Sequence, residues 1–390
     1  MRDTRDINSP RQLVLISSLA SSITLFRGPL ISELVSRGIK VYAFAPDYDD
    51  SSDAAVRSLG AIPVQYSMAR AGMNPFKDIT DLFRLCMQLR RLKPDVVFCY
   101  FIKPVIYGTL AARFAGVRRR FASIEGAGYV FTDSARPSFK KKLLRSFVVQ
   151  MYRTALSQTN KVFMLNPDDR QLFVDEGMVS AAKVQPLDGI GLSLDHYQAA
   201  APVSTPFRFL LIGRLLREKG VYDYIEAARI VKRSHPHVSF CLLGNCDANP
   251  GSISEREAEQ WVKEGLLEWP GQVADVREWI ARSSVFVLPS YREGLPRSTQ
   301  EAMAMGRPVI TTDVPGCRET VVHGRNGLIV PVRNPEALAA AMLRFVEQPD
   351  LIASMGAESR RMAEERFDVR KINESILRTM ELLEPTPVMS

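Results

Sequence analysis

The stretch that decides the fold is residues 285–310, which read VFVLPSYREGLPRSTQEAMAMGRPVI. Its first four residues are β-branched, aromatic and aliphatic, as in a strand buried in a parallel sheet, and the run 300–305 indicates a helix. Ser298 and its neighbour supply N-cap chemistry for that helix. The stretch therefore predicts a strand, a loop and a helix in succession, with Glu293 in the loop and Glu301 on the helix.

A loop that joins a strand to a helix in this way suits the binding of a diphosphate. Backbone N–H groups and the positive end of the helix dipole point out of such a loop. Carboxylates in the same place accept hydrogen bonds from sugar hydroxyls. The pair Glu293 and Glu301 thus predicts a site that holds an anion and a polyol together.

Strand-like and helical runs alternate along the whole chain of 390 residues. This alternation and this length predict an α/β protein with two doubly wound units. The expected strands include residues 13–17, 41–45, 96–100, 161–164, 207–212, 238–243, 285–288 and 308–311. The expected helices of the first unit include residues 29–37, 80–91 and 107–114.

The boundary between the units is expected at residues 200–206, a stretch of small residues and prolines that is typical of a linker. We therefore expect a first domain over residues 1–199 and a second over 200–369. The end of the chain, residues 370–390, carries apolar residues at helical spacing and is expected to be a separate terminal helix.

Positive charge is concentrated in the first half of the chain. The net charge of +8 divides into +9 for residues 1–195 and −1 for the remainder. In the segment 136–153, apolar residues recur at helical spacing beside lysines and arginines, as in an amphipathic helix that lies on an anionic membrane. The same stripe would also suit a helix that packs on its own domain, so both interpretations stay open. Nucleic acid is disfavoured, because few aromatic residues are interleaved with the basic run and no binding motif occurs.

The cysteines and histidines suggest neither a disulfide framework nor a metal site. The five cysteines are odd in number and form no C-x-x-C pair, which favours a reduced, cytoplasmic compartment. The apolar stretch 13–26 is too short to span a bilayer and is interpreted as the first strand with its loop. No histidine has a second histidine or a carboxylate four residues on, the spacing by which one helix face offers two metal ligands. We expect no cofactor and no metal.

A pair of cations follows the first strand of the second unit. Arg214 and Lys219 come directly after that strand and a glycine, on the same side of the sheet as the Glu293 loop. They are suited to neutralising a diphosphate, the arginine through a bidentate fork and the lysine as a point charge. Such cations stabilise a transition state in which negative charge develops on a diphosphate leaving group.

The spacing of Glu293 and Glu301, followed by the runs 302–310 and 324–328, resembles the retaining glycosyltransferases of family 4. The segment 123–132, SIEGAGYVFT, resembles the capsule and O-antigen branch of that family. The resemblance implies the GT-B fold, in which two Rossmann-like domains face a cleft and a last helix crosses back to the first domain. The first domain would bind the acceptor and the second the nucleotide sugar.

The resemblance also assigns roles to residues of the second domain. Glu293 would bind hydroxyls of the donor sugar, and Glu301 the ribose of the nucleotide. Backbone groups would hold the phosphates and the base at Gly244, Val273, Gly294 and Leu295. Catalysis would rest on Glu293, Arg214 and Lys219, with the departing diphosphate taking the proton of the acceptor.

In the first domain the chain departs from the family. Many members carry a histidine near the donor sugar, yet the histidines here begin only at His196. Glu125 stands at about that place and is a candidate to bind a sugar hydroxyl or the acceptor, with a solvated or ion-paired glutamate as the alternative. Gly28, expected in the loop after the first strand, is a candidate for close approach to the donor phosphate. Lys103 is a candidate for the acceptor phosphate.

We therefore expect a cytoplasmic enzyme, peripheral at the inner face of the cell membrane. It would move a sugar from a nucleotide diphosphate, with UDP as the expected carrier, to a hydroxyl of a polyprenyl-diphosphate-linked glycan, with retention at the anomeric centre. Its expected partners are the nucleotide sugar, the lipid-linked acceptor and an anionic membrane surface. A sugar-nucleotide epimerase and a non-catalytic nucleotide-sugar binding protein are the alternatives.

Overall fold

The computed structural model describes residues 11–68, 75–128, 131, 139–247 and 251–383. The start of the basic segment, residues 136–138, and residues 129, 130 and 132 of the segment 123–132 lie outside this part of the chain. The chain divides into two compact units. Unit 1 comprises Met1–Gly191 with Arg370–Ser390, and unit 2 comprises Leu192–Val369.

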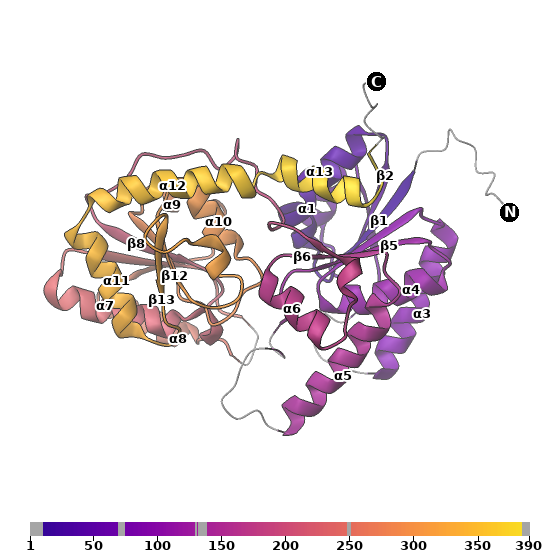
Figure 1. Ribbon diagram of the computed structural model, residues 1–390, viewed down its shortest axis with the longest axis horizontal. Helices are drawn as coiled ribbons and strands as arrows, with labels where there is room; N and C mark the ends of the chain where they lie inside the picture. Colours follow the sequence, from indigo (N-terminus) through magenta and orange to yellow (C-terminus); the bar gives the residue numbers. More distant parts are fainter. Residues whose placement is uncertain (1–10, 69–74, 129–130, 132–138, 248–250, 384–390) are drawn as a thin grey trace. The chain divides into compact units, whose positions relative to one another are not determined.

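Unit 1 is a doubly wound α/β unit with a parallel sheet of order β3-β2-β1-β4-β5-β6-β7 (Figure 1). The strand order reverses between β1 and β4, which pair with each other. In chain order its elements are β1 (Gln12–Ile16), α1 (Ala20–Ser36), β2 (Lys40–Ala45), α2 (Asp50–Ser58), β3 (Ile62–Gln65), α3 (Pro75–Leu92), β4 (Val96–Tyr100), the π-helix η1 (Pro104–Gly108), α4 (Thr109–Phe114), β5 (Arg119–Ile124), α5 (Phe139–Leu156), β6 (Lys161–Met164), α6 (Pro167–Asp175), the 3₁₀ turn η3 (Ala181–Lys183), β7 (Val184–Pro186) and α13 (Val369–Thr379).

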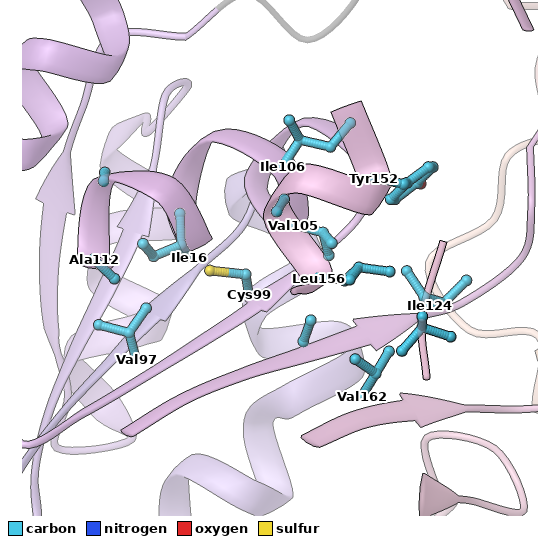
Figure 2. Close-up of a cluster of buried hydrophobic side chains, with 14 of the residues drawn as sticks. Ile16, Val97, Cys99, Val105, Ile106, Ala112, Ile124, Tyr152, Leu156 and Val162 are labelled. Atoms are coloured by element: carbon cyan, nitrogen blue, oxygen red, sulfur yellow. The ribbon is translucent and has the colours of Figure 1, made fainter. Parts of the chain in front are cut away.

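The core of unit 1 fills both faces of this sheet. On one face, Val97 and Cys99 of β4 belong to the same buried cluster as Tyr152 and Leu156 of α5 (Figure 2). Because side chains alternate along a strand, Phe98 and its neighbours at even positions of β4 point to the opposite face, toward α1. Strands buried on both faces read as continuous apolar runs, which is why they could be predicted.

Helix α1 begins at Ala20, nine residues before the predicted start. The carboxylate of Asp47, from the loop after β2, accepts the N–H of Ala20 at 2.7 Å, and Ser22 Oγ donates to the carbonyl of Leu19 at 2.6 Å. These contacts cap the helix although Leu19 at the N-cap makes no side-chain capping bond. Pro29 lies inside the helix.

Unit 2 has the same architecture, with a parallel sheet of order β10-β9-β8-β11-β12-β13. Its order reverses between β8 and β11. In chain order its elements are β8 (Arg208–Ile212), the 3₁₀ turn η4 (Arg217–Lys219), α7 (Val221–Ser234), β9 (Ser239–Leu243), α8 (Glu255–Lys263), β10 (Glu268–Gly271), α9 (Arg277–Ala281), β11 (Val285–Leu288), α10 (Arg297–Ala304), β12 (Val309–Thr312), the 3₁₀ turn η5 (Arg318–Thr320), β13 (Gly327–Val330), α11 (Pro335–Glu347) and α12 (Asp350–Arg366). The two sheets confirm the predicted fold class.

The change of unit falls between Gly191 and Leu192 rather than at the proline-rich stretch 200–206. The segment that follows Leu192 is bonded to unit 2. Leu192 N–H donates to the carbonyl of Phe367 at 2.8 Å, and the buried Arg307 donates to the carbonyl of Ala201 at 2.8 Å. These long-range bonds attach a segment whose composition alone is typical of a linker.

The chain returns to unit 1 at Arg370. Ile376 and Leu377 of α13 are buried, and Arg119 of β5 lies 3.7 Å from the carboxylate of Glu381 just beyond the helix. Along the ranges that the structure describes, no helix combines the length and the apolar character that crossing a membrane requires.

Candidate active site

The loops after β8 and β11 meet at the carboxyl ends of the central strands of unit 2. This is the place where the strand order reverses, and open α/β sheets bind ligands there. Lys219, at the end of η4, donates to Glu293 Oε1 at 2.5 Å, and Ser290 Oγ donates to the same oxygen at 2.7 Å. The two predicted residues are therefore side by side, and both are mostly buried, with 20% and 11% of their side chains exposed.

Two glycines allow these loops to pack closely. Gly220 has a φ of +70°, and a Cβ there would lie 1.9 Å from the carbonyl oxygen of Pro289. Gly316, in the loop after β12, has a φ of +77°, and a Cβ would lie 2.5 Å from the carbonyl oxygens of Glu293 and Gly294. No side chain fits at either position, so the glycines hold the Glu293 loop against its neighbours.

Helix α10 starts earlier than predicted. Its N-cap is Pro296, which makes no side-chain capping bond, and Ser298 lies in the first turn instead of capping it. The N–H groups of a first helical turn have no partner within the helix, and they carry the positive end of its dipole. This end follows directly on the buried Gly294 and Leu295, which places it beside the Glu293 loop. Pro296 itself has no N–H to offer.

Glu301 is held on α10 by two neighbours. Tyr197 Oη donates to its Oε1 at 2.9 Å, and Arg297 Nε donates to the same oxygen at 2.8 Å. Burial, together with the nearby Glu301 carboxylate, raises the pKa of Tyr197 well above its usual range. Tyr197 thus stays protonated and remains a donor, and the Glu301 carboxylate has a fixed orientation.

Arg214 lies in the same loop as Lys219 but has a different carboxylate partner. Its Nη1 donates to Asp247 Oδ2 at 2.6 Å, and 54% of its side chain is exposed. The remaining N–H groups of a guanidinium are available for a second, forked contact. Arg214 and Lys219 therefore both occupy the β8 loop, each beside a carboxylate.

The loops expected to read the base lie at the ends of β9 and β10. Gly244 has a φ of +137°, and a Cβ there would lie 2.0 Å from the carbonyl oxygen of Gly213, so only glycine fits. Its N–H donates to Gly271 at 2.8 Å, and Asn245 Oδ1 accepts the N–H of Gln272 at 2.9 Å. Val273 follows as a half-buried residue.

The predicted residues of unit 1 are divided between the sheet edge and a helix. Lys103 and Glu125 follow the neighbouring strands β4 and β5, and both are ion-paired. Lys103 Nζ lies 3.0 Å from the buried Asp78, and Glu125 Oε1 accepts a hydrogen bond from Arg27. Gly28 lies inside α1, where an added Cβ would meet Leu59 at 3.7 Å, an ordinary packing distance. The expectation of a Gly28 loop after β1 is wrong, because that helix begins at Ala20.

Sequence reasoning missed the residues that hold the candidate residues in place. Arg297 was detectable, because it stands four residues before Glu301 on the same helix. Arg27 carries a signal too, since it interrupts an apolar stripe of α1. Ser290 was also within reach, because it stands three residues before Glu293. The partners from distant parts of the chain, Tyr197 and Asp247, carry no local signal.

Metal binding is not favoured by any side-chain cluster in the described part of the chain. No group of three or more His, Cys, Asp or Glu residues there is arranged to hold an ion. Cys317, close to Glu293, is buried, and burial raises the pKa of its thiol to about 12. The expectation that catalysis needs no metal stays a prediction.

Two family models match the chain, one in each unit. "Glycosyl transferase 4-like" matches residues 13–166, and "Glycosyl transferases group 1" matches residues 206–348. The N,N'-diacetylbacillosaminyl-diphospho-undecaprenol alpha-1,3-N-acetylgalactosaminyltransferase of Campylobacter jejuni is 27% identical, over 86% of this chain and 89% of that protein. The capsular polysaccharide biosynthesis glycosyltransferase CapM of Staphylococcus aureus is 24% identical, over 92% of this chain and 94% of that protein.

Solved structures agree with the fold. The Anabaena protein Alr3699/HepE, crystallised with UDP, superposes with a TM-score of 0.75 at 17% identity, over 96% of this chain and all of that chain. The sucrose-phosphate synthase of Thermosynechococcus elongatus superposes with a TM-score of 0.78 at 18% identity, over 95% of this chain and 98% of that chain. One glycosyltransferase family model matches each Rossmann-like unit, and the relatives that match over most of the chain are glycosyltransferases too. The chain therefore belongs to the glycosyltransferases of family 4 and has the GT-B fold.

Proposed function

We propose that this glycosyltransferase moves a sugar from a nucleotide diphosphate, with UDP as the expected carrier, to a hydroxyl of a lipid-linked glycan, with retention at the anomeric carbon. The observation that carries the proposal is the contact between Lys219 and Glu293 at 2.5 Å, held at the switch point of unit 2. A cation for phosphate and a carboxylate for sugar hydroxyls occur there together. The start of α10 adds backbone N–H donors.

The proposed reaction exchanges one glycosidic bond for another. The acceptor oxygen attacks the anomeric carbon while the bond from that carbon to the donor phosphate breaks. The acceptor proton passes to the departing diphosphate on the same face, so the products are the glycoside and the nucleoside diphosphate. Lys219 and Arg214 stabilise the charge that develops on the leaving group, and Glu293 orients the sugar through its hydroxyls. No protein nucleophile is required.

The acceptor class is inferred from the relatives. The Campylobacter relative is named for an undecaprenol-diphosphate substrate, and an Escherichia coli relative, 24% identical over 70% of this chain, is named for a diphosphoundecaprenol substrate. CapM is named for capsular polysaccharide biosynthesis. These names support a polyprenyl-diphosphate-linked glycan in cell-surface polysaccharide synthesis as the acceptor.

An exposed apolar surface on unit 1, flanked by cations, supports the lipid-linked acceptor. Helix α5 has two different halves. Its C-terminal half is core, with Val148 and Tyr152 buried. Its N-terminal half extends past the neighbouring helices of unit 1 (Figure 1) and exposes Phe139, Leu143 and Phe147 at 80%, 63% and 46%. The C-terminal half of this basic amphipathic helix therefore packs in the core of unit 1, whereas its N-terminal half carries an exposed apolar stripe.

Helix α3 carries a second exposed pair on the same face of the sheet. α3 packs on α4, and α5 packs on η1, so the two helices flank one layer. Ile79 and Phe83 of α3 are 63% and 66% exposed. Exposed cations accompany both stripes, such as Arg84 on α3 and Lys142 on α5. Each helix starts at the carboxyl edge of the sheet, so these apolar residues lie near the edge that carries Lys103. Apolar side chains flanked by cations suit an anionic bilayer.

The donor site is tested by calorimetric titration of the purified protein with UDP, GDP and ADP in EDTA, and by sugar transfer with the Glu293→Ala variant. We expect UDP to bind selectively, and we expect the variant to bind UDP but to transfer no sugar. Unchanged turnover in the variant would contradict the role of Glu293. A product formed from the nucleotide sugar without acceptor would favour an epimerase, and binding without any product a binding protein.

The membrane surface is tested by sedimentation with vesicles of phosphatidylcholine, with and without phosphatidylglycerol. The variant Phe139→Ser/Leu143→Ser/Phe147→Ser removes three exposed side chains, each worth about 1 kcal/mol when it enters the bilayer, so its partition should fall roughly 100-fold. The matched control, Val262→Ser/Val322→Ser, removes exposed apolar residues of unit 2 at 40% and 45% and should bind like the wild type. Equal binding of both variants would contradict the proposed surface.

A further inference from the structure

Unit 1 contains a fully buried arginine on a helix face that is otherwise apolar. Arg27 is 1% exposed, and the residues that share its face of α1, such as Ile23, Leu30, Ile31 and Leu34, are all buried. Taking a guanidinium out of water is costly unless it is paired. An apolar residue of similar size would fill the position at least as well for stability. The reason for an arginine at this position is therefore sought in the groups that it contacts.

The partners of Arg27 are one carboxylate and two aromatic rings. Its Nη2 donates to Glu125 Oε1 at the end of β5. Its guanidinium carbon lies 5.3 Å from the ring centroid of Phe98 and 5.0 Å from that of Tyr100. Both rings are buried on β4 and limit the movement of the guanidinium. The contact thus spans three elements, α1, β4 and β5, at the carboxyl edge of the sheet.

Glu125 is held through one oxygen only. Among the described residues, Arg27 is its hydrogen-bond partner, and that bond goes to Oε1. The side chain of Glu125 keeps 12% of its surface exposed. Burial raises the pKa of Glu125, and the charge and hydrogen bond of Arg27 oppose that rise. Oε2 remains as an acceptor at the carboxyl edge of the sheet, at the end of β5, one strand beyond the point between β1 and β4 where the strand order reverses.

We propose that Arg27 is a positioning residue for Glu125: it keeps the carboxylate ionised and fixes its orientation, so that Oε2 accepts a hydrogen bond from a substrate hydroxyl. Arg27 does not touch the substrate itself. The proposal rests on the proposed transferase function and concerns the residue that occupies the place of the missing first-domain histidine.

The charged surroundings of Glu125 make its ionisation depend on Arg27. Among the residues that the structure describes, the titratable groups that face it from the packed elements are Arg27 on α1 and Tyr100 on β4. Burial raises the pKa of Tyr100 to about 12, so this tyrosine is neutral in the working range and supplies no charge. When Arg27 is removed, burial acts on Glu125 unopposed, and protons bind to it at higher pH than in the wild type.

The test is the pH profile of kcat/KM for sugar transfer in the wild type and in Arg27→Met, Arg27→Lys and Glu125→Gln. We expect the acidic limb of the Arg27→Met profile to lie at higher pH than in the wild type, with at least a tenfold loss near neutral pH that shrinks as pH rises. Arg27→Lys keeps the charge and should restore the limb. The profile of Glu125→Gln should have no such acidic limb. The double variant Arg27→Met/Glu125→Gln should have a kcat/KM less than twofold lower than that of Glu125→Gln alone.

A merely structural arginine would behave differently. Arg307→Met is the matched control, because Arg307 is also fully buried but donates to backbone carbonyls. Its variant should lose stability without any movement of the acidic limb. If Arg27→Met folds poorly, the pH profiles of Arg27→Lys and Glu125→Gln decide whether Arg27 positions Glu125. An acidic limb that does not move in an active Arg27→Met enzyme, or full additivity with Glu125→Gln, overturns the proposal. A wild type that transfers no sugar from any nucleotide sugar contradicts the proposed function instead.

Discussion

Replacement of Lys219 by methionine should separate the two tasks that this residue performs. The Lys219 Nζ lies 2.5 Å from Glu293 Oε1, and the two side chains are only 20% and 11% exposed. Methionine has a stem of similar length but no charge and no donor. The change therefore leaves a partly buried carboxylate without its cation, and removes a cation from the proposed phosphate site.

The expected loss of stability follows from the burial of the pair. Removing one partner of a fully buried ion pair costs about 3–5 kcal/mol. Here Ser290 still donates to the same oxygen at 2.7 Å, and both side chains keep some contact with water. We therefore expect a loss of about 2 kcal/mol, which lowers the Tm of a unit of this size by about 4–8 °C. The proposed loss of a cation from the leaving-group site should lower kcat about 10²–10³-fold.

A double variant distinguishes stability from catalysis. In Lys219→Met/Glu293→Gln the carboxylate is replaced by a neutral amide, so calorimetry should show most of the lost Tm regained. Its kcat, measured through the release of the nucleoside diphosphate, should stay at least as low as that of Lys219→Met. Two results would refute the reasoning. One is a Lys219→Met enzyme with the kcat of the wild type, and the other is a double variant whose Tm is no higher than that of Lys219→Met.

Two further substitutions test how the site is held. Gly316→Ala should displace the Glu293 loop and lower the affinity for UDP at least tenfold in calorimetric titration. The control is Gly324→Ala, which has the same φ of +77° but no atom within 4 Å of the added carbon, and it should bind UDP like the wild type. Equal affinities of the two variants would contradict the packing argument. Arg360→Met removes hydrogen bonds of 2.8 Å and 2.6 Å to two carbonyl oxygens, one of them at the end of α10, and should cost about 2 kcal/mol in denaturant unfolding. The side chain of its neighbour Arg361 is 42% exposed, and within the described part of the chain its salt bridges run only along its own helix. Arg361→Met should therefore leave the unfolding midpoint nearly unchanged, and a similar shift in both variants would contradict this prediction.

The strands and the edges of the sheets could be predicted because their signals are local. Buried parallel strands are short apolar runs, and the glycines that follow them mark tight turns. The placement of Lys219 and Glu293 on the loops after β8 and β11 needed only the order of strands and helices. The Arg297 contact to Glu301 was also within reach, because it spans one helical turn.

Features that depend on distant parts of the chain could not be predicted in this way. The start of α1 is set by Asp47, 27 residues from Ala20. The attachment of residues 192–201 to unit 2 depends on Arg307, 106 residues from Ala201. The pairing of Arg27 with Glu125 spans 98 residues. In each case a buried polar group is satisfied by a partner that folding alone brings near.

The central claim is sugar transfer with retention from a nucleotide sugar, and product analysis tests it most directly. The protein is incubated in EDTA with UDP-N-acetylglucosamine and other UDP-sugars, each with a polyprenyl-diphosphate-linked glycan, and the new linkage is identified by proton NMR of the anomeric signal. The account predicts a product with the anomeric configuration of the donor, formed without added metal, and absent with Glu293→Ala. An inverted linkage, or a product that forms only when a divalent metal is restored, would contradict it.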